Sequence, residues 1–233
     1  MINEKRLVDT FLKLVQIDSP SGQEKILVNY LVDYIKSLSL PLLVVVDKSG
    51  NIICKTFQND KPILLTAHLD TVEPGKSIKP VIKSGVIKSD GTTILGADNK
   101  VGVVAILESL TSYFEKYRNL PSLEVVFTVS EEVGNLGAIN LDYSSLRSKL
   151  GFSFDGGEPV GTITTASPYY TRFDITLIGK SAHAGKPELG VNPILVFTTA
   201  MKTISLGRLP NVNWKIKLCI INGNNSLKLC IFS

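Results

Sequence analysis

The sequence is poor in cysteine, histidine and tryptophan, and it has no long apolar run. Its three cysteines, Cys54, Cys219 and Cys230, stand at spacings that fit neither a disulfide framework nor a cysteine metal site. The longest apolar run, residues 40–46, is seven residues long, whereas a membrane-spanning helix needs roughly 20. The N-terminus also lacks the basic and then apolar segment of a secretory signal. We therefore expect a cytoplasmic protein in a reducing compartment.

Apolar side chains are abundant enough to form a core. Of the 233 residues, 44% are hydrophobic and 20% are charged, which excludes a disordered chain and is typical of one or two domains. The net charge of +4 is spread unevenly: residues 1–188 carry a net −1, and residues 189–233 hold five lysines and arginines and no acid. Because those five are thinly spread and form no stripe, the charge does not indicate a nucleic-acid partner.

Hydrophobic periodicity predicts alternating helices and strands over the first two thirds of the chain. Helical spacing occurs over residues 3–16, over 99–114, and in a segment that opens with the capping-box pair Ser21 and Glu24. Strands are predicted at residues 42–47, 52–55, 62–67, 123–129 and 151–154, with a small hairpin at 81–88. This alternation predicts an α/β fold, with helices packed on a mixed β-sheet.

The pattern changes after about residue 168. Residues 170–178 alternate polar and apolar, as in a strand with one wet face, residues 193–206 favour a helix, and residues 215–221 favour another strand. We therefore expect two domains. The first is an α/β domain over residues 1–167, and the second is the start of a smaller α+β domain over residues 168–233.

Acids or a histidine stand at four junctions where a predicted strand or helix begins or ends. These junctions are residues 68–70 (HLD), 96–98 (GAD), 130–132 (SEE) and 154–156 (FDG). Taken singly, each has a simple structural explanation. Asp98 suits a helix cap, His68 a hydrogen-bonded core histidine, and the remaining acids solvated loops or turns. Taken together, several acids near one imidazole at strand ends would repel one another unless a cation joined them.

A hydrolytic site with two zinc ions fits these residues. Such ions lie about 3.5–4 Å apart and need a bridging carboxylate, for which Asp98 at a helix start is suited. His68 and Asp155 complete the ligands of one ion, and Glu132 serves the other. Asp70 lies two residues after His68 and can hold the other nitrogen of its imidazole ring.

Glu131 is the acid left over from this assignment. It is free to act as a general base that takes a proton from the attacking water and passes it to a leaving amine. Every acid of the four junctions then has its own role.

The four segments resemble those of the dinuclear zinc peptidases that include peptidase T, aminoacylase and carboxypeptidase G. Residues 68–72 (HLDTV), 96–100 (GADNK), 130–134 (SEEVG) and 154–156 (FDG) occur in the family's order and rough spacing. Residues 89–96 (SDGTTILG) are most similar to the peptidase T side of the family. The resemblance covers about residues 3–210 and implies a zinc exopeptidase-like fold with the residue roles given above.

The resemblance also implies a lid or dimerisation domain inserted in the catalytic domain. Residues 179–185 (GKSAHAG) match a family segment whose histidine helps to polarise the scissile carbonyl, commonly in the partner subunit's site. His183 is therefore expected to be catalytic, and a homodimer through the lid is expected. The simpler alternative for His183 is a histidine in a glycine-rich loop.

This chain departs from the family pattern in three ways. Asn99 stands where many relatives have a second acid, which we expect to be tolerated because Asp98 is the bridge. The family runs well past this length and supplies a further histidine to the second zinc, whereas His68 and His183 are the two histidines here. Residues from about Asn211 lack acids and fit the family poorly. We interpret them as a frameshifted or aberrant tail, with a divergent lid strand at 214–221 as the alternative.

The sequence thus predicts a zinc-dependent aminopeptidase or tripeptidase that hydrolyses small peptides and is impaired by truncation, with an incomplete second zinc site. One alternative is an inactive fragment or a partner-binding α/β domain. The other is an N-acyl amino acid deacylase or a carboxypeptidase of the same family. We expect no nucleic-acid partner and no membrane association.

Overall fold

The computed structural model describes residues 1–58, 61–166, 172–203, 207–208, 215–223 and 226–232. The chain forms two compact units, Met1–Glu158 and Pro159–Ser233. The domain boundary expected at residues 167–168 lies outside the described residues. In the part that the structure describes, no helix is long and apolar enough to cross a bilayer.

The first unit follows the predicted order of helices and strands. Its helices are α1 (Glu4–Val15), α2 (Lys25–Ser37), α3 (Ala97–Tyr117) and α4 (Leu136–Ile139), with a 3₁₀ turn at Tyr143–Ser145. Its strands are β1 (Leu42–Val46), β2 (Ile52–Thr56), β3 (Ile63–His68), β4 (Pro80–Lys83), β5 (Val86–Ser89), β6 (Leu123–Thr128) and β7 (Leu150–Ser153). The sequence did not predict α4, which is a single turn.

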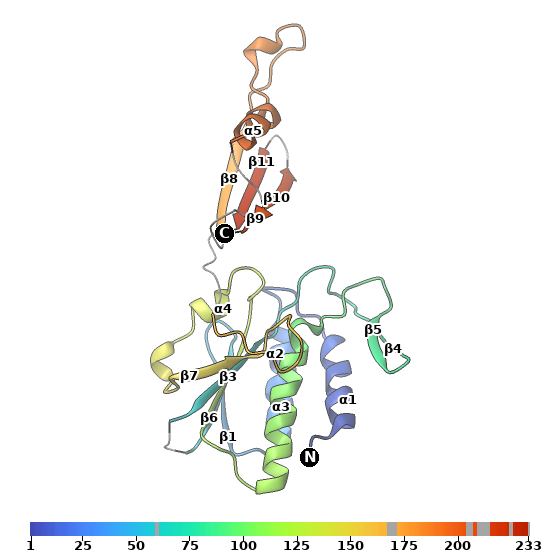
Figure 1. The fold of residues 1–233 in the computed structure, drawn as a ribbon, viewed down its shortest axis with the longest axis vertical. Helices are drawn as coiled ribbons and strands as arrows, with labels where there is room; N and C mark the ends of the chain where they lie inside the picture. Colours follow the sequence, from blue (N-terminus) through green and yellow to red (C-terminus); the bar gives the residue numbers. More distant parts are fainter. Residues whose placement is uncertain (59–60, 167–171, 204–206, 209–214, 224–225, 233) are drawn as a thin grey trace. The chain divides into compact units, whose positions relative to one another are not determined.

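Five strands form one mixed sheet in the order β1-β2-β6-β3-β7 (Figure 1). Strand β2 pairs antiparallel with both β1 and β6, whereas β3 pairs parallel with both β6 and β7. The carboxyl ends of β3, β6 and β7 therefore lie at the same edge of the sheet. The predicted fold class, helices packed on a mixed sheet, is confirmed.

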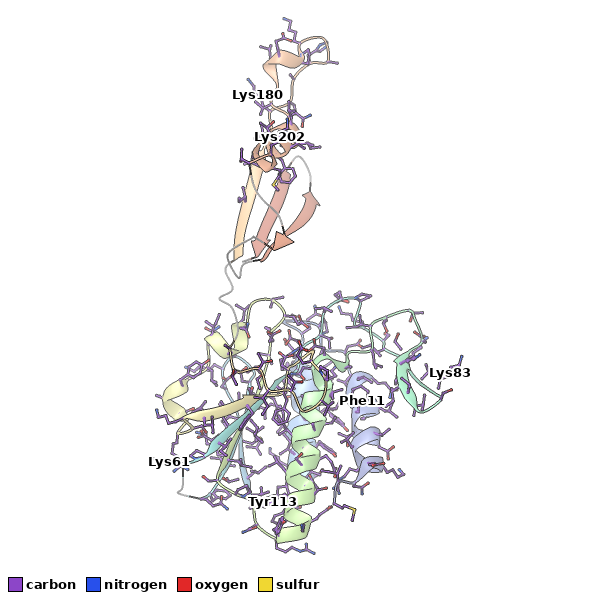
Figure 2. All side chains as sticks on the ribbon, in the orientation of Figure 1. Phe11, Lys61, Lys83, Tyr113, Lys180 and Lys202 are labelled. Carbon is purple, nitrogen blue, oxygen red and sulfur yellow. The ribbon has the colours of Figure 1, made fainter. Side chains whose placement is uncertain are left out.

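The main core lies between one face of this sheet and helices α1, α2 and α3. On β6 the buried side chains alternate: Val125 and Phe127 belong to this core, and Val126 joins a small cluster on the opposite face. Figure 2 labels Phe11, which α1 contributes to the main core. Because β6 is covered on both faces, its near-continuous apolar sequence is the pattern of a buried strand.

Helices α1 and α3 run side by side (Figure 1) and are joined by ion pairs. The guanidinium of Arg6 donates from Nε to Glu108 Oε2 at 2.6 Å and from Nη2 to Glu108 Oε1 at 2.9 Å. It also donates from Nη1 to Glu115 Oε1 at 2.5 Å. The side chain of Asn3 caps α1 by accepting from Arg6 N–H. The contacts of Arg6 hold the amino end of the chain against α3, the helix that carries Asp98.

In its described residues, the second unit contains an antiparallel sheet and one short α-helix. It contains β8 (Arg172–Ile178), α5 (Pro193–Met201), β9 (Gly207–Arg208), β10 (Lys215–Gly223) and β11 (Ser226–Phe232), with a 3₁₀ turn at Pro187–Leu189. The strand order is β8-β11-β10-β9. Asn192 caps α5 by accepting from Ile194 N–H. Of the predicted helix at 193–206, residues 204–206 lie outside the described residues.

The atypical tail carries two of these strands. Residues 215–221 lie in β10, which pairs with β11. This agrees with the strand alternative for residues 214–221, although residues 211–214 lie outside the described residues. The origin of the tail stays a prediction.

Candidate active site

The four junctions singled out in the sequence meet at the carboxyl edge of the parallel strands. His68 ends β3, Glu131 and Glu132 follow β6, and Asp155 follows β7. Asp98 is the second residue of α3. This edge of a sheet is where α/β proteins place their ligands.

His68 is the centre of the cluster. Its side chain is buried, with Nδ1 3.3 Å from Asp70 Oδ1 and Nε2 3.0 Å from Asp98 Oδ1. Asp155 Oδ2 lies 4.0 Å from the same Nε2. Burial lowers the pKa of His68, but the adjacent carboxylates of Asp70 and Asp155 outweigh it and raise this pKa to about 9. One ring nitrogen is thus held by a buried acid, while the other faces two carboxylates.

Asp70 is fully buried and connects three segments of the chain. Its Oδ1 accepts from Glu131 N–H at 2.9 Å, and its Oδ2 accepts from Glu132 N–H at 3.1 Å and from Ser21 Oγ at 2.6 Å. Burial raises the pKa of Asp70, but the adjacent His68 and the hydrogen bonds from Ser21 and from the two amides lower it to about 2. Asp70 therefore stays ionised while it orients the imidazole ring and the loop after β6.

The helix that follows Asp98 is capped by its neighbour. Asp98 (φ −80°, ψ 109°) and Asn99 (φ −119°, ψ 32°) have non-helical backbones, and Asn99 Oδ1 accepts from Gly102 N–H at 3.2 Å. This is the N-cap bond that the sequence offered as the simple explanation of Asp98. Because Asn99 supplies it, the Asp98 carboxylate is free to face His68.

Two groups of donors in this cluster could hold a metal ion. In each, one donor atom per residue lies within 4.8 Å of the others: His68 with Glu131 and Asp155, and His68 with Asp98 and Glu132. One imidazole nitrogen with several carboxylate oxygens is a donor set that zinc accepts. The geometry thus places Glu131 near enough to serve as a ligand, whereas the sequence assigned it the role of a base.

The acids of the cluster repel one another. Burial raises the pKa of Glu131, Glu132 and Asp155, although the charge of His68 lowers all three. The charges of neighbouring acids raise these pKa values further: Asp155 acts on Glu131, and Asp98 acts on both Glu132 and Asp155. A bound cation would offset this concentration of like charge.

The predicted capping box at Ser21 and Glu24 is wrong. Helix α2 begins at Lys25, and the side chain of Glu24 makes no cap bond to it. The hydroxyl of Ser21 instead donates to Asp70, and Glu24 Oε1 accepts from Ser130 N–H at 2.8 Å. Because both side chains bond to residues far away in the sequence, they do not form the two reciprocal hydrogen bonds of a capping box.

Lys100 is a further buried charge to which the sequence assigned no role. Its side chain is fully buried, and Nζ donates to Ile17 O at 3.2 Å. Burial lowers its pKa to about 8, against the attraction of Asp18 and Asp70, which raises it. The sequence signal that could have singled out Lys100 was its position in the segment 96–100, which also carries Asp98.

His183 belongs to the second unit, and the structure shows its surroundings only there. Its Nδ1 accepts from Gly185 N–H at 3.1 Å, and its backbone carbonyl accepts from Lys186 N–H at 2.8 Å. The side chain is exposed within that unit. The catalytic role expected for His183 stays a prediction.

Known proteins are similar to this chain in sequence, and some solved structures are also similar in fold. YqjE of Bacillus subtilis, described as uncharacterized, is 37% identical over 218 residues, which cover 90% of this chain and 59% of that protein. A tripeptidase structure from Staphylococcus aureus matches with a TM-score of 0.81 and 33% identity over 100% of this chain and 66% of its own. The aminopeptidase PepT structure from Bacillus cereus matches with a TM-score of 0.74 and 35% identity, over 99% and 66%. The chain thus spans about three fifths to two thirds of the length of these proteins.

The family itself is shown by a match to a family model. The model described as peptidase family M28 matches residues 51–168, which is half of the chain and includes the four junctions that form the carboxylate cluster. The resemblance to peptidases that the sequence indicated is confirmed by the tripeptidase and aminopeptidase structures. The chain therefore belongs to peptidase family M28.

Proposed function

We propose that this chain carries the catalytic residues of a zinc-dependent exopeptidase that hydrolyses small peptides, as an aminopeptidase or tripeptidase does. The observation that carries the proposal is the pair of donor groups around His68 at the carboxyl edge of the sheet. The similarity to a tripeptidase over the whole chain supports the substrate class.

The proposed site takes two ions that would share Asp98. His68, Asp98 and Asp155 would hold one ion, and Asp98 with Glu132 would hold the other, so the second ion has fewer ligands from the described residues. Asp70 would fix the imidazole so that Nε2 faces the first ion, because its carboxylate holds Nδ1. Bound zinc would supply Lewis acidity to a water molecule and to the scissile carbonyl.

Glu131 is proposed as the general base. It would accept the proton of the attacking water on a carboxylate oxygen and return it to the nitrogen of the leaving amine. Its backbone N–H is held by Asp70, which limits where the carboxylate can point. His68 and Asp155 lie within 4.8 Å of the nearest donor atom of Glu131, so the base and the ligands share one small volume.

The second unit is proposed as part of a lid that also forms a homodimer. In that arrangement His183 would donate a hydrogen bond to the scissile carbonyl oxygen as charge develops on it. The resemblance of residues 179–185 to the family segment supports this role. Light scattering on the purified chain tests the dimer, and a monomer at all concentrations would contradict it.

A peptidase assay tests the function. The purified chain is incubated with Zn²⁺, Co²⁺ or Mn²⁺ and offered tripeptides, dipeptides, N-acyl amino acids and peptides with a blocked N-terminus. We expect cleavage of tripeptides from a free N-terminus, lost on chelation and in His68→Ala. Preferred release of acyl groups or of C-terminal residues would favour the deacylase or the carboxypeptidase. No hydrolysis and no metal binding would favour the partner-binding domain.

A further inference from the structure

The loop after β6 is held by an unusual run of backbone hydrogen bonds. The N–H groups of Ser130, Glu131 and Glu132 each donate to a buried carboxylate of another chain segment. Asp70 takes the last two of these bonds, and Glu24 takes the first. Glu24 therefore holds the backbone of Ser130, the residue directly before Glu131 and Glu132, which are proposed as base and ligand.

Within the described residues, the side chain of Glu24 accepts its hydrogen bonds through one oxygen. Its Oε1 accepts from Ser130 N–H at 2.8 Å, from Ser130 Oγ at 3.0 Å and from Gly22 N–H at 2.9 Å. Its side chain is buried, and 106 positions separate it from Ser130 in the sequence. Since it provides no cap bond to α2, its side chain serves the loop after β6 and its own turn.

The bonded residue has an unfavourable backbone conformation. Ser130 has φ +53°, in the left-handed region that residues with a Cβ rarely adopt. This conformation turns the chain between the end of β6 and Glu131. Two hydrogen bonds from one residue to Glu24 hold it there, and such partners are what keep a disfavoured conformation in place.

We propose that Glu24 is a positioning residue, which holds the left-handed turn at Ser130 so that the carboxylates of Glu131 and Glu132 face His68. The reading of those two acids as base and ligand rests on the proposed function. That Glu24 holds the turn at Ser130 does not rest on the proposed function, and it can be measured separately. A partner that orients residues of a metal site typically changes metal affinity or activity about 10- to 100-fold when it is removed.

The chain offers a matched control in Glu124. This glutamate is also buried and also fixes a loop, accepting from Arg147 N–H at 3.0 Å, from Ser148 N–H at 2.9 Å and from Ser148 Oγ at 2.6 Å. It stands near the amino end of β6, whereas the cluster follows the carboxyl end. Replacing Glu124 thus removes a similar set of bonds away from the acids around His68.

The first measurement is the affinity for Co²⁺, followed by visible absorption in the full chain. We expect Glu24→Ala to weaken Co²⁺ binding about 10- to 100-fold and Glu124→Ala to leave it unchanged, although both lower the melting temperature. Glu24→Gln should restore most of the affinity, because an amide oxygen can accept all three bonds made by Oε1. Equal loss of affinity in Glu24→Ala and Glu124→Ala, or no loss in Glu24→Ala, would overturn the proposal.

The second measurement is hydrogen exchange of the amides of residues 130–132. Glu24→Ala should speed their exchange at least tenfold, whereas Glu124→Ala should leave it as in the unmodified chain. If the unmodified chain binds no Co²⁺, the proposed function fails. The hydrogen exchange of residues 130–132 then decides by itself whether Glu24 positions the turn at Ser130. Unchanged exchange in Glu24→Ala refutes it. Should Glu24→Ala not fold, Glu24→Asp keeps the charge, shortens the reach by one methylene and carries the same expectations.

Discussion

Asp70 Oδ1 lies 3.3 Å from Nδ1 of His68. His68 is the last residue of β3, and Asp70 follows it by two positions. The same carboxylate accepts from two amides of the loop after β6. One buried acid thus sets the orientation of the histidine and of the glutamates around it.

Asp70→Asn is expected to lower the affinity for Zn²⁺ or Co²⁺ about 10- to 100-fold, because an amide has one acceptor oxygen where the carboxylate uses two. Competition with a chromogenic chelator measures the affinity. Asp90→Asn, at an exposed aspartate that accepts from Thr92 N–H, is the control and should bind as the unmodified chain does. Unchanged affinity in Asp70→Asn would contradict the orienting role.

Metal binding is expected to stabilise the fold. A ligand at 100 times its dissociation constant contributes about 2.7 kcal/mol, which corresponds to a rise in melting temperature of about 5–11 °C for a domain of this size. Zn²⁺ should give this rise in the unmodified chain and in His183→Ala, and a chelator should reverse it. His68→Ala should show no rise, since it removes the nitrogen common to both donor groups. An equal rise in His68→Ala would place the metal elsewhere.

Glu131→Gln distinguishes a base from a ligand. As a base, Glu131 contributes about 10²- to 10⁴-fold to turnover, and the amide should lose this while metal affinity stays within a few fold. As a ligand, its replacement would lower metal affinity strongly, as in Asp155→Asn. Parallel measurements of tripeptide turnover and Co²⁺ affinity separate the two roles. The ligand result would require the first ion to be held by His68, Asp155 and Glu131.

The acid sensitivity of the first unit is expected to depend on Glu108. Burial raises the pKa of Glu108, but hydrogen bonds from Arg6, Ser112 and Asn3 outweigh it and lower this pKa. A lowered pKa means that the ionised acid stabilises the fold above its unfolded pKa of about 4.3 and that this contribution is lost as the pH falls through the folded pKa.

Glu108→Gln should therefore lower the free energy of unfolding by about 2 kcal/mol at pH 7, and by progressively less as the pH falls below 4. Urea unfolding between pH 3 and pH 7 measures the difference from the unmodified chain. Glu4→Gln, an exposed acid of α1, is the control. A difference that stays constant over this range would contradict the assignment.

Much of the first unit could be predicted from the sequence because its signals are local. The apolar spacing of α1 reflects the side chains that the helix buries, and the apolar run of β2 reflects burial on both of its faces. The observed bounds of both lie within a few residues of those predicted. Residues 68–70, 130–132 and 154–156 were expected at strand ends, and the parallel pairing of β3 with β6 and β7 brings these ends to one edge. The second unit was less predictable, and β11 was not foreseen.

By itself, the sequence determined which residues form the candidate site and their place at strand ends, although one of these strands, β7, is exposed. Only the tertiary structure decided which partner each polar side chain takes. Ser21 and Glu24 have the spacing of a capping box, yet they bond to Asp70 and to Ser130, which lie 49 and 106 positions away. Asn99, not Asp98, caps the helix. A local motif offers one possible partner, but a buried polar group bonds to whichever partner the sheet topology brings within reach. That topology depends on pairing between distant strands, so no short segment of the sequence predicts it.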